Sequence, residues 1–460
     1  MMKFNLYFRF LGIHGLMALL LLSACNEEDS LPPFNVNFAN QEIGISESGE
    51  VEIIFSRSAD NNGEIVLQMN SGNLVYGEEN DFYTIPAADN QQLILPFEAG
   101  NDKVSFEIME GSDLNIQQDE TITFTLSDDD NGLFLAGQNI IINALFSENF
   151  VAREGVIELN GGGEEQTNQA FVDLSKLTQT VVDKNSWHLG FYSESGEHKV
   201  ILNSSAYLMA RPLEKTDLAE VTPADTAGFA AAMQIPQFSP AFGAIAWVDA
   251  DNGDLGKTAF GDIAPDMASA KVFIVKREGA WQKVKIAQSG DNYQIQYADI
   301  NSNQIETATV EKDPEYNFTF FSFENKVVMV EPAKNQWDFM YGTFTVSLPL
   351  GGGAVVPYGF KDYIVINRTG VSVARVMESD IAYDDFSQAD ISGLEFSSDQ
   401  NAIGDSWRQG GGPNSAPSLF TDRYFVLQDD DGQFYKIQFT RLTTPGGERG
   451  FPEFIFELVQ

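Results

Sequence analysis

The sequence is short of cysteine, histidine, basic residues and long apolar runs. Cys25 is the only cysteine, so an intramolecular disulfide is excluded. The 27 lysines and arginines face 67 acidic residues, and the net charge of −40 argues against nucleic acid or anionic lipid headgroups as partners. Beyond the N-terminal segment, no apolar run is long enough to span a bilayer.

The chain also lacks the familiar catalytic motifs. It contains no His-Glu-x-x-His, no nucleophile elbow and no phosphate loop, and its Gly-Gly-Gly runs at 161–163, 351–353 and 410–412 lack the residues that phosphate binding requires. A dispersed Ser/His/Asp triad would have only His188 and His198 to draw on. No catalytic residues are predicted, and the sequence favours a protein that is not an enzyme.

The N-terminus has the pattern of an exported lipoprotein. Residues 1–24 combine Lys3 and Arg9 with a short apolar run and small residues before Cys25, which predicts a signal peptide and a lipid anchor on that cysteine. Residues 25–33 form an acidic tether that resembles the surface-export signal of Bacteroidetes lipoproteins; a merely solvated tether is the alternative. We therefore expect an outer-membrane lipoprotein, exposed at the cell surface and attached to the membrane through lipid only. Without residues 1–24, 25 basic residues face 67 acids, a net charge of −42.

The length of 460 residues predicts two or three domains, and the composition favours an all-β fold. Residues 34–150 alternate apolar and polar positions in short segments between Gly-, Asn- and Asp-rich turns, which is typical of a β-sandwich. The segments are EVEIIFS, EIVLQM, QLILPF, KVSFEIM, TITFTL and their neighbours.

SESGEVEIIFS, GEENDFYTIPA and QQDETITFTL resemble Calx-β repeats over about 34–148. The resemblance implies Ca²⁺ bound by acids at the loop ends, because Ca²⁺ takes six to eight oxygen ligands from converging loops. The matching positions are Glu47, Asp81, Asp119 and Glu120, with Asp113 a weaker fit. Gln117 and Gln118 depart from the denser acidic run of the family, and strand-end turn acids without an ion remain the alternative.

The rest of the chain contains a repeated pattern. KNSWHLGFY at 184–192 matches KNQWDFMY from Lys334, and Phe171 and Phe321 each precede the tryptophan by 16 residues. Asn203 and Asn367 end matching apolar strands, an acidic segment follows each, and Gly279 and Lys283 match Gly432 and Lys436. Matches that keep their order while the offset drifts indicate a duplicated unit with loop insertions.

The duplication predicts two related, mainly antiparallel β units at 155–310 and 315–460. The alternating strand after each tryptophan is expected to place Trp187, Leu189 and Phe191 on one face. We expect the two tryptophans to be core anchors, the hairpin lysines to be solvated and residues 222–234 to form the one helix.

FSFENKVVMVEPAKNQWD at 321–338, the strand Tyr363 to Asn367, and DGQFYKIQF at 431–439 resemble the HmuY family over about 155–460. The resemblance implies an all-β surface lipoprotein that holds haem iron with His or Met and passes haem to an outer-membrane transporter. It makes haem or a haem-bearing protein the expected partner, for iron acquisition.

The first unit is the better candidate for haem, because it holds both histidines outside the signal segment. His198, His188 and Met209 are the candidate iron ligands, Tyr207 a candidate ligand or stacking partner, and Arg211 a candidate propionate contact. The alternatives are polar surface histidines and a methionine that fills the core.

A second function stays open at this point. Sandwich domains also serve as non-catalytic modules that bind a glycan or protein, and exposed Trp281 or Trp407 would suit sugar stacking. The alternative for Trp407 is a loop residue that packs back onto the sheet.

Overall fold

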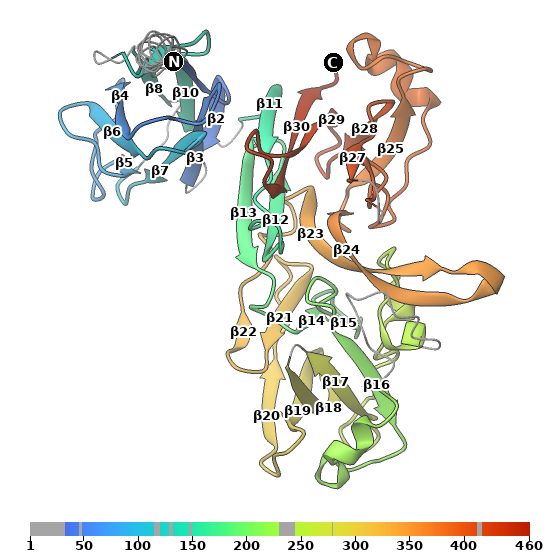
Figure 1. Ribbon diagram of the computed structural model, residues 1–460. Coiled ribbons are helices and arrows are strands. Elements are labelled where there is room, and N and C mark those ends of the chain that lie inside the picture. The colour runs from blue at the N-terminus through green and yellow to red at the C-terminus, as the bar shows by residue number, and fades with distance from the viewer. Residues whose placement is uncertain are drawn as a thin grey trace, which may run out of the picture.

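A computed structural model of the chain describes residues 33–45, 48–114, 120–127, 132–146, 150–229, 244–277, 279–411 and 416–460. They form β-strands joined by turns and short 3-10 helices, so the prediction of an all-β protein is confirmed. A sandwich is followed by a larger β-structure, which we call the body (Figure 1). The predicted signal peptide, Cys25 and all but the last residue of the tether lie outside the described residues.

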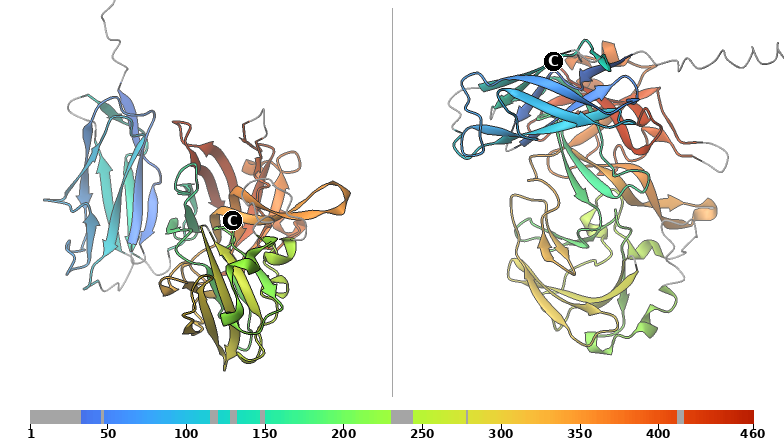
Figure 2. Two further views of the ribbon diagram at one scale, coloured as in Figure 1. Left: turned by 60° about the horizontal axis from the view of Figure 1, so that its bottom comes forward. Right: turned by 60° about the vertical axis from the view of Figure 1, so that its left-hand side comes forward.

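The N-terminal sandwich consists of two five-stranded sheets. One has the strand order β5-β7-β3-β1-β9 and the other β2-β10-β8-β4-β6. Figure 2 shows this sandwich in blue to teal in two further views. The strands are β1 (Phe34–Phe38), β2 (Glu42–Ile45), β3 (Ser48–Phe55), β4 (Gly63–Asn70), β5 (Phe82–Ile85), β6 (Gln92–Phe97), β7 (Lys103–Glu110), β8 (Glu120–Leu126), β9 (Phe134–Ala136) and β10 (Ile141–Phe146).

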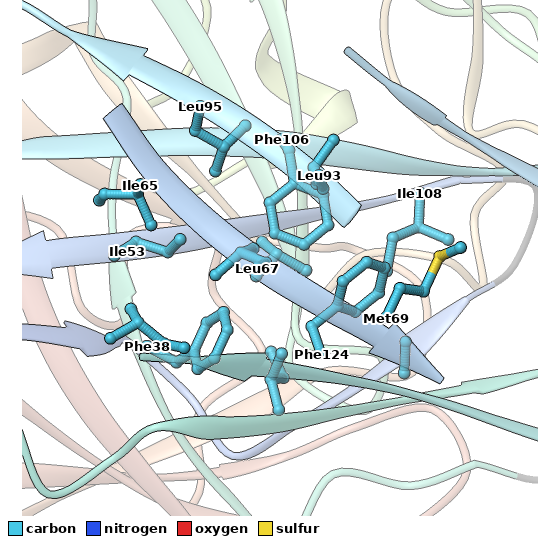
Figure 3. Packing of buried hydrophobic residues seen from close by; sticks show 14 of the residues in the cluster. Phe38, Ile53, Ile65, Leu67, Met69, Leu93, Leu95, Phe106, Ile108 and Phe124 are labelled. Carbon is cyan, nitrogen blue, oxygen red and sulfur yellow. The ribbon is translucent and has the colours of Figure 1, made fainter. Parts of the chain in front are cut away.

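The sandwich follows directly from the alternation in its sequence. In β3, Val51, Ile53 and Phe55 are buried while the residues between them face outward, because successive side chains of a strand point to opposite faces. Residues such as Phe38, Phe106 and Phe124 fill the space between the sheets (Figure 3).

The body contains four main sheets. Their strand orders are β11-β30-β29-β28-β25, β13-β12-β23-β24, β15-β14-β21-β22 and β16-β17-β18-β19-β20. The strands are β11 (Glu154–Glu158), β12 (Asn168–Asp173), β13 (Thr178–Asp183), β14 (Leu189–Tyr192), β15 (Val200–Leu202), β16 (Met209–Leu213), β17 (Val272–Arg277), β18 (Ala280–Ser289), β19 (Asn292–Asp299), β20 (Glu306–Val310), β21 (Phe318–Ser322), β22 (Lys326–Val328), β23 (Phe339–Pro349), β24 (Val355–Ile366), β25 (Ser372–Met377), β28 (Arg423–Gln428), β29 (Phe434–Thr443) and β30 (Arg449–Leu458). A small sheet joins β26 (Arg408–Gln409) to β27 (Ser418–Leu419).

The two halves of the body have matching strand orders but exchange strands. The hairpin β12–β13 of the first half pairs with β23 of the second, and the hairpin β21–β22 of the second half pairs with β14 of the first. The edge strands are exchanged too, since β11 completes the sheet of β30. The two units read from the sequence are therefore interleaved in space. The sheets β13-β12-β23-β24 and β15-β14-β21-β22 each contain strands from both units.

The pairing register corrects one of the sequence matches. Val172 lies opposite Phe339, and Phe321 lies opposite Leu189, the counterpart of Phe339 in the first half. Phe321 is thus the structural equivalent of Val172. The equivalent of Phe171 is Phe320 and not Phe321, because the segment between the strand and the tryptophan is one residue longer in the second half.

The expectation that each tryptophan shares a face with the strand after it was wrong. Leu189 and Phe191 pack in the core beside β17–β19, whereas Trp187 belongs to the opposite cluster. Trp337 and Phe339 likewise belong to two different hydrophobic clusters. Both tryptophans precede the first strand residue, so the two-residue alternation of a strand does not apply to them.

The lysines of the two repeated hairpins are buried, which corrects the prediction that they are solvated. The Nζ of Lys283 donates to the carbonyl oxygen of Val221 at 3.2 Å, and that of Lys436 donates to Tyr383 at 3.0 Å. Their partners lie in the acidic segments, which fold over the sheets as turns of 3-10 helix. The short helices are η1 (Leu218–Glu220), η2 (Pro223–Thr226), η3 (Ala244–Trp247), η4 (Leu255–Lys257), η5 (Gly351–Gly353), η6 (Tyr383–Asp385) and η7 (Gln388–Gly393).

Within the helix expected over 222–234, Pro223–Thr226 form the short 3-10 helix η2, and Phe229 is α-helical. The backbone N–H of Thr222 donates to Asp225 Oδ2 at 2.8 Å, a capping box that the second half repeats between Ser387 and Asp390 at 2.9 Å. Residues 230–234 of the expected helix lie outside the described residues.

A buried ionic cluster surrounds Asp362 in β24. Its carboxylate accepts from Tyr341 Oη at 2.8 Å and from Arg449 Nε at 3.0 Å, and also from Gln166. Arg408 Nε lies 3.5 Å from Oδ2. The carboxylate is fully buried and joins β23 and β24 to the loop before β12 and to β30.

Candidate functional site

A cleft of about 100 Å³ opens between the two sheets that contain exchanged hairpins. Its walls come from β12, β23 and β24 on one side, from β15 and β21 on the other, and from the segment 249–258. Most of the surface is apolar, and the ring-bearing residues of the lining are Phe171, Trp187, Phe318, Phe320, Trp337 and Phe344.

The two repeated tryptophans both line the cleft. Trp187 packs edge to face on Phe320, with ring centroids 4.6 Å apart, and Trp337 packs edge to face on Phe171 at 5.1 Å. Each tryptophan therefore contacts the phenylalanine of the other half. This arrangement is a direct result of the hairpin exchange, and it makes both halves contribute to one site.

Asn203 and Asn367 fix the segments that carry the tryptophans. Asn203 Nδ2 donates to the carbonyl oxygens of Lys184 and Trp187 at 2.7 and 2.9 Å. Asn367 Nδ2 makes the same two bonds to Lys334 and Trp337, each at 2.8 Å. Both asparagines are fully buried, so these amides hold the Lys-Asn-x-Trp turns in place.

The two halves differ at the indole N–H groups. Trp187 Nε1 donates to Gln169 Oε1 at 2.8 Å, and Gln169 Nε2 donates in turn to Ser205 Oγ at 3.0 Å. The structural equivalent of Gln169 in the second half is Phe318, which offers no acceptor. Trp337 Nε1 is buried and has no hydrogen-bond partner among the described residues.

Arg368 and Glu331 are the ionisable groups at the Phe318 side of the cleft. The Arg368 guanidinium lies 5.1 Å from the centroid of the Phe318 ring, and its Nη2 donates to Gln400 Oε1 at 2.9 Å. Burial lowers the pKa of Arg368 and raises the pKa of Glu331 to about 8. Glu331 accepts from the backbone N–H of Phe318 at 3.0 Å and is a neutral acid over most of the physiological range.

The Glu331 pKa predicts a loss of stability with rising pH. The unfolded chain releases this proton near pH 4.5 and the folded chain near pH 8, so the folded state is progressively disfavoured as pH rises between those values. We expect the free energy of unfolding of Glu331→Gln, which keeps an oxygen for the Phe318 N–H, to fall by about 2 kcal/mol less than that of wild type between pH 6 and 7.5. Urea unfolding at the two pH values measures this difference. Glu315→Gln, at an exposed position, is the control; equal pH slopes for wild type and Glu331→Gln would contradict the assignment.

His188 has a structural role that its counterpart Asp338 shares. His188 Nδ1 accepts from the backbone N–H of Phe323 at 3.2 Å, and Asp338 Oδ2 accepts from Leu174 at 2.7 Å, which is the equivalent residue. Nδ1 faces the Phe323 N–H and Nε2 faces Arg277 Nη1, which is also a donor, so neither ring nitrogen is open to iron. Arg277 closes off Nε2 at 3.2 Å, and burial lowers the pKa of His188 to about 4.

His198 lies far along the hairpin from His188. Asn203 N donates to His188 O, and Tyr192 N donates to Lys199 O, so His198 lies opposite Ser193, five residues along the strand from His188. At 3.3 Å per residue the separation is about 16 Å. Two nitrogens that share one metal lie about 4 Å apart, because each bond is about 2 Å long. The two histidines therefore do not form a pair of axial ligands in this arrangement.

The other haem candidates are not gathered around the cleft. Met209 is buried in the cluster beneath η1, and Tyr207 precedes β16 with its pKa raised to about 12 by burial. Arg211 lies 4.8 Å from the Phe229 ring centroid and donates to the carbonyl oxygens of Asp225 and Ala227. None of the five candidates lines the cleft, whose only thioether among the described residues is Met340. As haem ligands they remain predictions.

The calcium candidates can be followed only in part. Glu47 and Asp119 lie outside the described residues. Asp81 Oδ2 accepts from the backbone N–H of Val75 at 2.6 Å, as an acid that stabilises a turn does. Glu120 is the first residue of β8. Asp113 is exposed, and its backbone N–H donates to Asn80 O at 3.0 Å. Within the described ranges, no group of three or more His, Cys, Asp or Glu side chains is placed to hold a metal ion, so calcium binding remains a prediction.

The tryptophans considered for sugar stacking pack inside the body. Trp407 is buried and stacks on Phe439, with ring centroids 4.2 Å apart, which agrees with the alternative of a loop residue that packs back onto the sheet. Trp281 is half-buried against Phe229 at 5.1 Å. These positions give no exposed aromatic platform for a sugar.

A larger groove of about 870 Å³ lies between the sandwich and the body. Its lining is mainly polar and acidic, and Lys103 bridges it by pairing with Glu52 at 2.9 Å and with Glu158. The groove has no aromatic pair and no unpartnered buried donor among the described residues that line it. The smaller aromatic cleft is therefore the candidate site.

Sequence patterns marked only part of this site. The Lys-Asn-x-Trp repeat and the two asparagines marked its frame, but Gln169, Glu331 and Arg368 carry no motif. The difference between Gln169 and Phe318 becomes visible only when the strands are aligned by their pairing register, because the sequence match is shifted by one residue.

A mainly apolar cleft with a few polar groups is typical of a ligand-binding site. The sequence pattern of the HmuY protein family matches residues 165–456, which is more than half of the chain, and the chain belongs to that family. No curated protein matches it. Among the described residues, no helix is both long and apolar enough to cross a membrane.

The solved structures similar to the chain include calcium-binding domains of Calx. The apo-form Calx CBD1 domain shares 16% identity over 25% of this chain and 95% of its own, with a TM-score of 0.20. The Calx CBD2 domain shares 11% over 25% and 88%, also at 0.20. A proposed carbohydrate-binding protein from Bacteroides ovatus ATCC 8483 shares 8% over 93% and 98%, at 0.18. Scores this low carry no argument about the ligand of this chain.

Proposed function

We propose that this protein is a surface-anchored binding protein that captures haem or a related flat ligand in the aromatic cleft. The observation that carries the proposal is the cleft itself, where Trp187 and Trp337 from the two halves meet in one apolar wall. Membership of the HmuY family supports a haem-type ligand. The lipoprotein pattern ending at Cys25 supports attachment to the outer membrane, from which the ligand passes to a transporter.

The cleft suits the flat part of a porphyrin better than its iron. No histidine lines it among the described residues, and Met340 is the one soft donor. Its volume of about 100 Å³ is below the roughly 300–1,000 Å³ of sites that enclose a whole ligand of this size. The cleft therefore accommodates the edge of a macrocycle, whose remaining surface stays outside the wall.

Titration of haemin and of iron-free protoporphyrin IX into the chain without residues 1–25 tests the proposal. We expect both to bind at one equivalent, with a sharpened Soret band for haemin, since the cleft offers ring contacts rather than a pair of histidine ligands. His188→Ala and His198→Ala are expected to leave the spectrum of the haemin complex unchanged. Absence of binding by both compounds, in the oxidised and reduced states of haemin, would rule the proposal out.

A further inference from the structure

Two donors on the cleft wall have no acceptor. Trp337 Nε1 and Arg368 Nε are both buried atoms without a hydrogen-bond partner among the described residues, and both residues line the cleft. The Trp337 side chain is well enclosed, with the residue only 6% exposed. A buried N–H that makes no hydrogen bond costs about 1–3 kcal/mol, so an unpaired donor in a binding wall indicates a partner that arrives with the ligand.

The first half of the body has an acceptor where the second half has none. There Gln169 supplies the acceptor for Trp187 Nε1 at 2.8 Å. In the second half the equivalent position is Phe318, whose ring supports the Arg368 guanidinium at 5.1 Å instead. The second half thus lacks the acceptor that Gln169 provides in the first, and its Phe318 ring lies against a cation.

Arg368 also has no counter-ion. No carboxylate of the described residues lies within 4.0 Å of its guanidinium nitrogens, although three acids line the cleft. Asp254 pairs with Lys257 at 2.9 Å, and Asp249 accepts backbone N–H groups of Leu202 and Ala259 at 2.6 and 2.8 Å. Burial raises the pKa of Glu331 to about 8, so this third acid is neutral at pH 7.

The two donors are held by one turn. Asn367, the neighbour of Arg368 in sequence, donates to the carbonyl oxygen of Trp337 at 2.8 Å. Arg368 Nη2 is tied to Gly253 O at 3.1 Å and to Gln400 Oε1 at 2.9 Å. The indole and the guanidinium are thereby oriented before any ligand arrives, which lowers the entropic cost of binding.

From these contacts we propose that the cleft binds a carboxylate: the ligand carries an acid group on the edge of a flat apolar ring, and that group accepts from Trp337 Nε1 and pairs with Arg368. The inference rests on the proposed function for the position of the site, but it specifies the chemistry that the site recognises. A charge-assisted bond to an otherwise uncompensated guanidinium is stronger than a neutral one, so the acid group contributes affinity as well as orientation.

The test compares acids with their esters in the same soluble chain. The probes are protoporphyrin IX and its dimethyl ester, and 2-naphthoate and its methyl ester, whose size matches the cleft more closely. Titrations follow the indole N–H signals of ¹⁵N-tryptophan-labelled protein. We expect each acid to bind about tenfold more tightly than its ester and to shift the signal that Trp337→Phe removes.

Trp187→Phe is the matched control, because its N–H already has Gln169 as acceptor. Trp337→Phe is expected to weaken binding of the acids about tenfold more than Trp187→Phe does, and thermal melts establish that both variants fold. Equal affinity of acids and esters, or equal effects of the two variants, would overturn the carboxylate inference. If porphyrin still bound in that case, the proposed function would stand. Naphthoate binding without any porphyrin binding would overturn the proposed function and leave the carboxylate inference standing. Absence of binding by all four probes would overturn both.

Discussion

Replacing Asp362 by alanine is expected to lower the free energy of unfolding by about 3–5 kcal/mol. The carboxylate is fully buried and accepts from Tyr341 and Arg449, with Arg408 3.5 Å away. Removing it leaves two guanidinium groups and a phenol without their common acceptor, and a buried charge that loses its partner is more costly than the pair was stabilising. Urea unfolding at constant pH measures the change.

Asp262→Ala is the control for this experiment. Asp262 also pairs with a cation, Lys199 at 3.0 Å, but its side chain is 99% exposed, and we expect no measurable change in the unfolding midpoint. Asp362→Asn keeps an oxygen for Tyr341 and removes the charge, so its stability should fall between wild type and Asp362→Ala. If Asp362→Ala unfolds at the same urea concentration as Asp262→Ala, the cluster has no stabilising role.

The second large effect is expected at the repeated asparagines. Asn203→Ala and Asn367→Ala should each destabilise the protein by about 2–4 kcal/mol, because each leaves one buried and one partly buried carbonyl oxygen without a donor. Asn367→Ala should also weaken ligand binding, since the turn of Trp337 and Arg368 loses its tie. Thermal or urea unfolding, with porphyrin titration of the folded variant, checks both statements.

Aspartate is an informative replacement at the same positions. It keeps the shape and an acceptor for the backbone N–H of Ala206 or Thr369, but it has no N–H for the carbonyl oxygens. We expect Asn203→Asp to be at least as destabilising as Asn203→Ala. Asn301→Ala is the control, because Asn301 lies at an exposed turn and its side chain donates to Asp299 at 3.1 Å. A loss at Asn203 no greater than at Asn301 would speak against the anchoring role.

The all-β class and the doubling of the body could be predicted from the sequence because both depend on local patterns. Alternating residues specify strands, and Lys-Asn-x-Trp with its distant Asn, Gly and Lys specifies a recurring unit. The exchange of hairpins leaves no such pattern. Whether β12 pairs with β14 of its own half or with β23 depends on contacts between residues far apart in sequence, and both pairings bury the same faces.

The site was harder to predict for a related reason. His188 attracted attention because a histidine stands where the other half has Asp338, yet both side chains accept a backbone N–H from equivalent residues, Phe323 and Leu174. The burial of Lys283 likewise depends on an acidic segment that folds over its sheet. Residue type determines which hydrogen bonds a side chain can make, whereas the partner that it bonds depends on tertiary contacts.

The interleaved halves have a consequence for how the chain folds as it is made. Ala170 in β12 pairs with Tyr341 in β23, so the first hairpin waits for a segment 171 residues later. At about 5–20 residues per second this delay is on the order of 10–30 s, during which the edges of β12 and β14 lack their final partners. Unpaired strand edges template aggregation. The nascent first half therefore exposes unpaired strand edges until the second half arrives to complete its sheets.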